Sequence, residues 1–148
     1  MKYFAYGSNM DPERMKERNV NFTLRTLAVL EGWEITFNKT SSRNPKEGYA
    51  NITRKEGKTV EGVLYEINES DLKILDKYEG YPDHYERKTV KVKLKNGELI
   101  EAYTYIANPK KVKKGLKPSR EYLEHLLKGH DLLSEKYCKN LEEVETID

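Results

Sequence analysis

The segment around Asn96 and Gly97 limits the fold of this chain more than any other. Apolar residues at positions 90, 92 and 94 alternate with lysines at 91, 93 and 95, and after the Asn-Gly pair a second apolar run extends from Leu99 to Ile106. A period of two indicates a strand with one buried face, and Asn-Gly is the dipeptide most typical of a tight hairpin turn. The sequence therefore predicts two antiparallel strands here, with the lysines facing solvent.

The rest of the chain adds further strands and inserts helices between them. Apolar or alternating patterns predict strands over residues 2–6, 22–30, 33–38, 49–53 and 60–67. Gly32, between the second and the third of these, indicates a bulge or bend. Capping residues ahead of apolar stripes predict helices over 12–18 after Asp11, from 68–70 to Gly80, and from Ser119 and Ser134 onward. This order, in a chain of 148 residues, favours one α+β domain over residues 1–148, whose mainly antiparallel sheet curls toward a small barrel with flanking helices.

The composition excludes several classes of protein. Because 27 Lys and Arg face 25 Asp and Glu, the net charge is only +2, and no nucleic-acid or anionic-lipid partner is expected. The apolar runs are too short to cross a membrane and the first residues lack the pattern of a secretory signal, so we expect a cytoplasmic protein. Cys138 is alone, and His84, His125 and His130 lack the spacing of zinc ligands, so neither a disulfide nor a bound metal is expected.

The residues from Tyr6 to Asn9 stand between the first predicted strand and the first predicted helix. A glycine followed by small polar residues at such a place can present free backbone N–H groups beside the positive end of a helix dipole, which suits a carboxylate or a phosphate. An ordinary tight turn would use the same residues, and the segment lacks the lysine and further glycines of a phosphate-binding loop. The sequence therefore leaves an anion site and a plain turn as alternatives.

Glu79 is the one charged residue centred on the apolar stripe of the helix that ends at Gly80. At about 100° per residue, Leu72 and Leu75 define that stripe and Glu79 falls between them, in the last turn, where the helix dipole disfavours a carboxylate. Burial and the dipole both predict a raised pKa for Glu79, as a residue that takes up and releases protons requires. The alternative is that the helix frays at Gly80 and Glu79 simply reaches water.

Tyrosine is frequent in this chain, with 11 residues. Tyrosines can wall a small pocket with their apolar faces while their hydroxyls bind polar groups of a substrate, although most of the 11 also fit ordinary core and strand positions. A surface for single-stranded nucleic acid also combines tyrosine with lysine. That interpretation is disfavoured because the lysines at 91, 93 and 95 alternate with apolar residues, as on the solvent face of a strand.

Several segments, in this order, resemble the γ-glutamylcyclotransferase family. Residues 3–9, YFAYGSN, are similar to the substrate-binding loop of that family, and residues 75–80, LDKYEG, are similar to the segment that carries its catalytic glutamate. Residues 62–65, GVLY, match the strand that leads into the catalytic helix. Three further places match positions of active-site tyrosines in the family: Tyr85, residues 105–108, and residues 119–122. The resemblance extends from Tyr3 to about Tyr137.

The resemblance implies a small mixed β-barrel and a reaction that uses neither a metal nor an organic cofactor. The substrate would be a small γ-glutamyl amide, whose α-amine attacks its own γ-carbonyl to give 5-oxoproline and a free amine. Glu79 would act as general acid and base. The family positions that would contact the substrate are the loop residues Tyr6, Gly7, Ser8 and Asn9 and the pocket tyrosines Tyr85, Tyr105 and Tyr122.

The resemblance leaves three matters open. The substrate could be a γ-glutamyl amino acid, a γ-glutamyl peptide, glutathione or a γ-glutamylamine, because residues 80–85, GYPDHY, are particular to this chain and could reshape the leaving-group pocket. The alternative function is a non-catalytic protein of the same fold that binds a γ-glutamyl or other carboxylate ligand, in which a retained buried Glu79 would have no purpose. The oligomeric state is also open, with a homodimer among the options.

Overall fold

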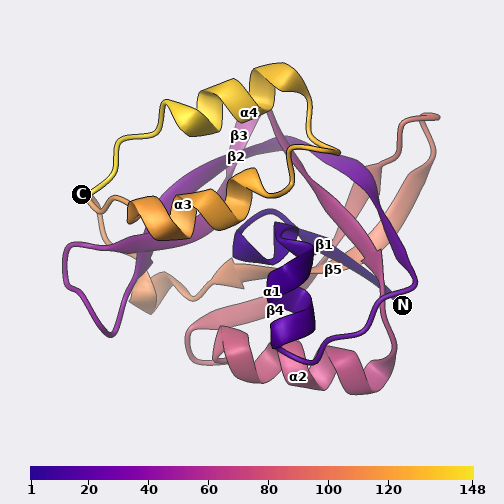
Figure 1. Ribbon diagram of the computed structural model, residues 1–148, viewed down its shortest axis with the longest axis horizontal. Helices are drawn as coiled ribbons and strands as arrows, with labels where there is room; N and C mark the ends of the chain where they lie inside the picture. The colour runs from indigo at the N-terminus through magenta and orange to yellow at the C-terminus, as the bar shows by residue number, and fades with distance from the viewer.

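In the computed structural model, which describes residues 1–148, five strands form a closed barrel in the order β1-β3-β2-β4-β5 (Figure 1). The strands are β1 (Lys2–Ala5), β2 (Leu24–Thr40), β3 (Gly48–Glu66), β4 (Tyr85–Lys93) and β5 (Leu99–Ala107). The helices are α1 (Pro12–Glu17), α2 (Glu69–Glu79), α3 (Arg120–Leu127) and α4 (Glu135–Glu142), with 3₁₀ turns η1 (Ser8–Met10) and η2 (Pro109–Lys111). Only β1 and β5 pair in parallel. The predicted α+β class and mainly antiparallel mixed barrel are confirmed.

The predicted hairpin at Asn96-Gly97 is present as the β4-β5 pair. Its ladder runs from Tyr85 opposite Ala107 to Lys93 opposite Leu99, and Gly97 takes a φ of 89°, the left-handed conformation that the turn requires. Val92 is fully buried, whereas Lys91 is exposed. The alternation in the sequence therefore reports the two faces of β4 correctly.

The middle strands differ from the prediction, because pairs of short predicted strands are continuous in the structure. Residues 22–30 fall largely, and residues 33–38 entirely, in the single strand β2, and residues 49–53 and 60–67 fall largely in β3. The ladder shifts register between Glu31 and Trp33, where Gly32 has a φ of 84°. The bulge or bend that the sequence indicates at Gly32 is therefore present. A β-bulge bends a strand without ending it, so the two predicted strands on either side of Gly32 are one strand of a long hairpin.

The strand β1 carries side chains into two separate apolar clusters. Phe4 and Tyr6 join a cluster with Leu64 and Val92, whereas Tyr3 and Ala5 join a larger cluster that includes residues of α2, α3 and α4. Successive side chains of a strand point to opposite faces, so β1 is buried on both sides. The loop that follows β1 therefore starts from a firmly held position.

Each predicted helix start is confirmed by its capping contact. The side chains of Asp11, Asn68, Ser119 and Ser134 each accept a hydrogen bond from a backbone N–H in the first turn of the helix that follows. Gly80 ends α2 with a φ of 63°, and its N–H bonds back to the carbonyl oxygen of Lys77. The helix end is thus closed rather than frayed. None of the helices has the length and apolar character needed to span a membrane.

Gly62 of β3 provides a test of how tightly β1 is held. A Cβ atom at this position would lie 2.5 Å from the carbonyl oxygen of Ala5 and 2.7 Å from the ring of Phe4. We expect Gly62→Ala to lower the free energy of unfolding by about 1–3 kcal/mol, because over-packing forces the core to shift. Urea unfolding followed by circular dichroism measures this. The control, Thr59→Ala at an exposed position of the same strand, should change it by less than about 0.5 kcal/mol. Equal midpoints for the two variants would contradict the close packing.

Candidate active site

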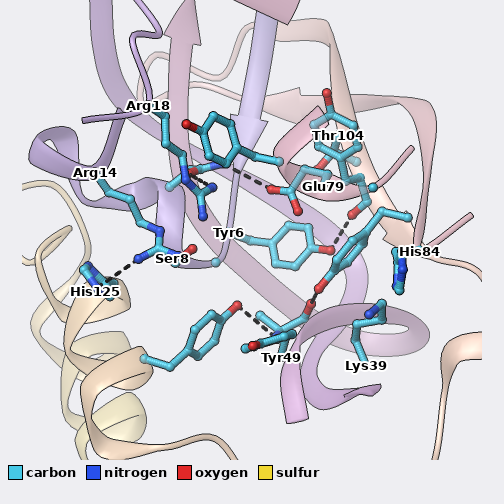
Figure 2. Close-up of a pocket in the computed structure, with 18 of the residues that line it drawn as sticks. Tyr6, Ser8, Arg14, Arg18, Lys39, Tyr49, Glu79, His84, Thr104 and His125 are labelled. Carbon is cyan, nitrogen blue, oxygen red and sulfur yellow. Dashed lines mark hydrogen bonds between the residues drawn. The ribbon is translucent and has the colours of Figure 1, made fainter. Parts of the chain in front are cut away.

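A pocket of about 410 Å³ opens where the loop after β1, the end of α2 and the start of α3 meet the barrel (Figure 2). Its volume lies within the range usual for small-molecule sites. It is lined by all eight residues that the sequence singled out: Tyr6, Gly7, Ser8, Asn9, Glu79, Tyr85, Tyr105 and Tyr122. No three His, Cys, Asp or Glu side chains cluster closely enough to hold a metal ion.

Glu79 sits at the closed end of α2 and lines this pocket. The Nδ2 group of Asn9 donates a hydrogen bond to its Oε1 atom over 3.2 Å. Burial raises the pKa of Glu79 above the ordinary glutamate value, although the charges of Arg18, Arg14 and Lys39 and the Asn9 hydrogen bond oppose that rise. The direction of the shift is the one the helix pattern predicts. A carboxylate in such surroundings can take up and release a proton nearer to neutral pH.

Asn9 joins the loop to Glu79 through hydrogen bonds that leave its side chain no free group. Arg18 donates to the Asn9 Oδ1 atom over 3.0 Å. Because a guanidinium can only donate, this contact fixes the orientation of the amide and turns its Nδ2 group toward Glu79 and the hydroxyl of Tyr3, which lies 3.0 Å away. The hydroxyl of Tyr65 holds the Asn9 carbonyl over 2.7 Å. Asn9 therefore positions Glu79, and its predicted contact with a substrate stays a prediction.

The loop itself keeps hydrogen-bond donors free on its pocket side. The Gly7 N–H and the Ser8 hydroxyl have no partner within the protein, and the first N–H groups of a short helix such as η1 have no acceptor inside it. The nearby Asp11 carboxylate does not occupy them, because it accepts from the N–H of Glu13 and pairs with His125. The loop therefore has donors available for a ligand, and the predicted anion site stays a prediction.

Three of the four tyrosines predicted for the site use their hydroxyl protons inside the protein. Each faces an acceptor that cannot donate: Tyr6 the Tyr105 carbonyl, Tyr85 the Ala50 carbonyl at 2.7 Å, and Tyr105 the Asp76 carboxylate at 2.7 Å. Asp76 also accepts from Arg87 over 2.6 Å, so both of its oxygens are occupied. These hydroxyls brace the pocket wall, and Asp76 is not a free carboxylate that could replace Glu79.

Tyr122 is different because its hydroxyl oxygen accepts a hydrogen bond. The N–H of Ala50 donates to it over 3.0 Å, so the Tyr122 proton remains available. A Cβ atom added at Gly7 would lie 3.3 Å from this oxygen, which places the hydroxyl beside the loop. Burial raises the pKa of Tyr122, so it stays neutral and able to donate. Tyr122 is therefore the predicted tyrosine best suited to bind a ligand oxygen.

The pocket is also lined by three cationic side chains that were not predicted from the sequence: Arg14, Arg18 and Lys39. Arg14 and Arg18 are four residues apart, a spacing that puts both on one face of a helical turn. Lys39 lies two residues after Phe37, so it continues the alternating series of Trp33, Ile35 and Phe37. Both spacings are visible in the sequence. However, a charged residue on a face that is expected to be buried indicates a binding site only when the pocket is known.

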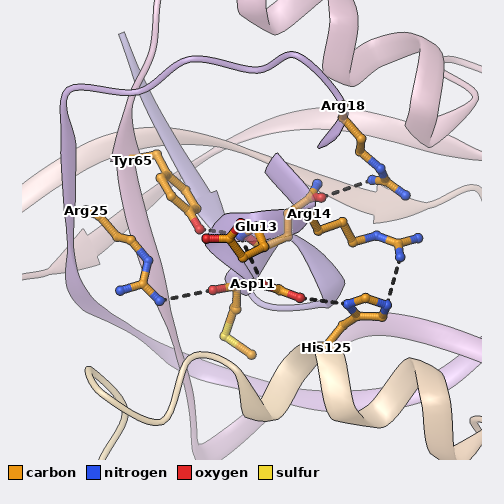
Figure 3. A network of polar contacts seen from close by, with 9 residues as sticks. Asp11, Glu13, Arg14, Arg18, Arg25, Tyr65 and His125 are labelled. Atoms are coloured by element: carbon orange, nitrogen blue, oxygen red, sulfur yellow. Dashed lines mark hydrogen bonds and ion pairs between the residues drawn. The ribbon is translucent and has the colours of Figure 1, made fainter. Parts of the chain in front are cut away.

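Arg14 is held in place by His125, which also lines the pocket (Figure 3). Its Nη1 group lies 3.1 Å from the Nε2 atom of His125, which must accept because a guanidinium only donates. The Nδ1 atom of His125 then carries a proton and donates to Asp11 over 2.8 Å. Burial lowers the pKa of Arg14, and the charge of Arg18 lowers it further. This chain of contacts keeps a poorly solvated positive charge at the pocket wall.

Comparison with known proteins identifies relatives of this chain. The sequence model of the family described as "Gamma-glutamyl cyclotransferase, AIG2-like" matches residues 3–124. The γ-glutamylcyclotransferase of Bos taurus is 31% identical over 99% of this chain and 79% of its own length, and that of Homo sapiens is 32% identical over 70% of this chain and 57% of its own length. A solved structure named "Gamma-glutamyl cyclotransferase" superposes with a TM-score of 0.87 at 29% identity, covering 100% of this chain and 89% of that one.

Because the pKa of Glu79 is raised, we expect ionisation of its carboxyl group to lower the free energy of unfolding. The folded protein binds the Glu79 proton more tightly than the unfolded chain does, so protonation of Glu79 stabilises the fold. This contribution is complete below the ordinary pKa of about 4.3 and is lost as the pH rises through the pKa of the folded state. We therefore expect Glu79→Gln to have a larger free energy of unfolding than wild type at pH 7, and the gain to vanish below about pH 4.

Urea unfolding at a series of pH values measures this difference. The control is Glu69→Gln at the exposed start of the same helix, which should gain nothing at pH 7 because its carboxylate faces solvent near the positive end of the dipole. A Glu79→Gln variant with the same pH dependence of stability as wild type would contradict the raised pKa.

Proposed function

The chain belongs to the gamma-glutamyl cyclotransferase family of enzymes, and we propose that it converts a γ-glutamyl amide into 5-oxoproline and a free amine, with Glu79 as general acid and base. The observation that carries the proposal is the position of Glu79. Its carboxylate has a raised pKa, lines the pocket and is hydrogen-bonded to Asn9 of a loop with free donors. Proton transfer and anion binding are thus available side by side.

The proposed reaction needs little covalent help from the protein, because nucleophile and electrophile belong to one molecule. The α-amine of the substrate forms a C–N bond to its own γ-carbonyl carbon, and the original amide C–N bond breaks. Glu79 accepts a proton from the attacking nitrogen and delivers it to the departing nitrogen, so the carboxylate is regenerated. The remaining task is to fold the substrate so that the reacting atoms meet, which is a large part of what enzymes contribute to such reactions.

The second part of the proposed function is the binding of an anionic group by the loop from Tyr6 to Asn9. We assign the α-carboxylate of the γ-glutamyl group, or the oxyanion of the tetrahedral intermediate, to the N–H of Gly7 and the hydroxyl of Ser8. The Tyr122 hydroxyl, whose proton is free, lies beside Gly7, and Arg14 adds positive charge at the pocket wall. Tyr6, Tyr85 and Tyr105 contribute apolar faces and rigidity in this assignment, since their protons are already used.

A non-catalytic protein of the same fold would need only the loop and the cations. It would gain nothing from a carboxylate whose burial raises its pKa, because an ionised Glu79 would repel a carboxylate ligand. The position of Glu79 therefore favours turnover over simple binding.

The direct test is release of 5-oxoproline from γ-glutamyl dipeptides, glutathione and γ-glutamyl-lysine, measured by mass spectrometry. We expect wild type to release equal amounts of 5-oxoproline and free amine from at least one of them. Glu79→Gln should keep the fold and lose about 10²–10⁴-fold in rate, because it removes the group that transfers the proton. Glu69→Gln should retain the wild-type rate. Normal turnover by Glu79→Gln would refute the role of Glu79.

The loop assignment predicts how the product binds. A Cβ atom at Gly7 would lie 3.3 Å from both the Ala50 Cβ atom and the Tyr122 hydroxyl, so a methyl group there crowds the place assigned to the carboxylate. We expect Gly7→Ala to bind 5-oxoproline at least about tenfold more weakly than wild type in calorimetric titration. Thr59→Ala, at an exposed position outside the pocket, should bind as wild type does. Unchanged affinity in Gly7→Ala would place the carboxylate elsewhere.

A further inference from the structure

Lys39 is a buried positive charge in the pocket for which the protein provides no counter-ion. Only 3% of the residue surface is exposed, and Lys39 takes part in none of the ion pairs in the structure. One of its three ammonium protons has an acceptor, the carbonyl oxygen of Thr40 at 2.6 Å. Burying an ammonium is unfavourable unless it is paired and hydrogen-bonded, so this arrangement is incomplete without an anion.

The surroundings of Lys39 hold the ammonium in place without neutralising it. The rings of Tyr85 and Tyr49 lie 5.5 Å and 5.9 Å from its Nζ atom, measured to their centroids. These faces attract a cation but offer no lone pair for its remaining N–H groups. The Lys39 backbone is paired with Tyr49 of β3 on one side and bridges to Val112 on the other. The side chain therefore projects into the pocket from a rigid element.

Lys39 and the loop lie on different sides of the pocket. Figure 2 shows Lys39 and His84 on one side of Tyr6, and Arg14, Arg18 and Ser8 on the other, with Glu79 close to the Tyr6 ring. A substrate whose γ-glutamyl carboxylate lies at the loop and whose scissile amide lies at Glu79 would extend its leaving group toward Lys39. Glu47 lines the same pocket but makes no ion pair with Lys39.

We propose that Lys39 binds a carboxylate carried by the leaving amine, so that the enzyme selects γ-glutamyl amino acids or peptides over γ-glutamylamines that lack a carboxylate. This inference rests on the proposed function and adds a specificity-determining residue to it. The carboxylate accepts the two free ammonium protons and supplies the missing counter-ion. A leaving group with a neutral end leaves Lys39 unpaired in the complex, and its transition state is correspondingly less stable.

The test compares two substrates that differ only at that carboxylate, γ-glutamyl-alanine and γ-glutamyl-alaninamide. Their ratio of kcat/KM cancels any effect of Lys39 on Glu79 or on the shared chemistry. We expect wild type to prefer the acid by at least about tenfold. The ratio should fall to about one in Lys39→Met, stay high in Lys39→Arg, and stay high in Lys114→Met, which makes the same change at an exposed lysine outside the pocket.

The outcomes separate this inference from the proposed function. Absence of 5-oxoproline from both substrates with wild type would refute the proposed function itself. Turnover of both without preference by wild type would overturn the role of Lys39, as would a preference that survives in Lys39→Met. An equal loss of turnover on both substrates in Lys39→Met, with the ratio unchanged, would assign Lys39 to proton transfer and overturn carboxylate binding. If Lys39→Met does not fold, Lys39→Gln takes its place with the same expected ratio.

Discussion

The hydrogen bonds of Asn9 hold the candidate site together. Its amide contacts Glu79 of α2, Tyr3 of β1 and Arg18 after α1, and its carbonyl accepts from Tyr65 of β3. Two partners near in the sequence, Tyr3 and Arg18, and two distant ones, Tyr65 and Glu79, are thereby tied to one residue of the loop. Loss of a single partner would leave a buried polar group unsatisfied, at a cost of about 1–3 kcal/mol. The loop and Glu79 therefore behave as one preorganised unit rather than as two neighbouring features.

The site brings together charged side chains whose burial disfavours their charged form. Burial raises the pKa of Glu79 and lowers those of Arg14 and Lys39, while the attraction between the carboxylate and the three cations works in the other direction. The fully buried core of the protein is formed instead by apolar residues such as Phe4, Leu64 and Leu75. Departures from the rules of core packing are expected at functional sites, and here they coincide with the pocket.

The sequence predicted what depends on local chemistry and missed what depends on distant partners. The hairpin turn at Gly97, the helix caps and the inward position of Glu79 follow from neighbours within a few residues, and all three are present. The sequence indicates a bulge or bend at Gly32, which is present, but it did not show that β2 continues through that bulge, because the continuity depends on pairing with residues of β3. The roles of the tyrosine hydroxyls also depend on contacts with distant residues. Whether Tyr85 or Tyr122 keeps a free proton depends on how each meets Ala50, which no local pattern reveals.

The most direct measurement of the central claim is the titration of the Glu79 carboxyl carbon by nuclear magnetic resonance in the intact protein, assigned by its loss in Glu79→Gln. The account predicts an apparent pKa above the ordinary value of about 4.3. It also predicts a further rise in Arg18→Met, because the positive charge that lowers the pKa is removed and the amide of Asn9 is released. A Glu79 carboxyl that titrates at or below the ordinary value would contradict a proton-transfer group prepared by the fold.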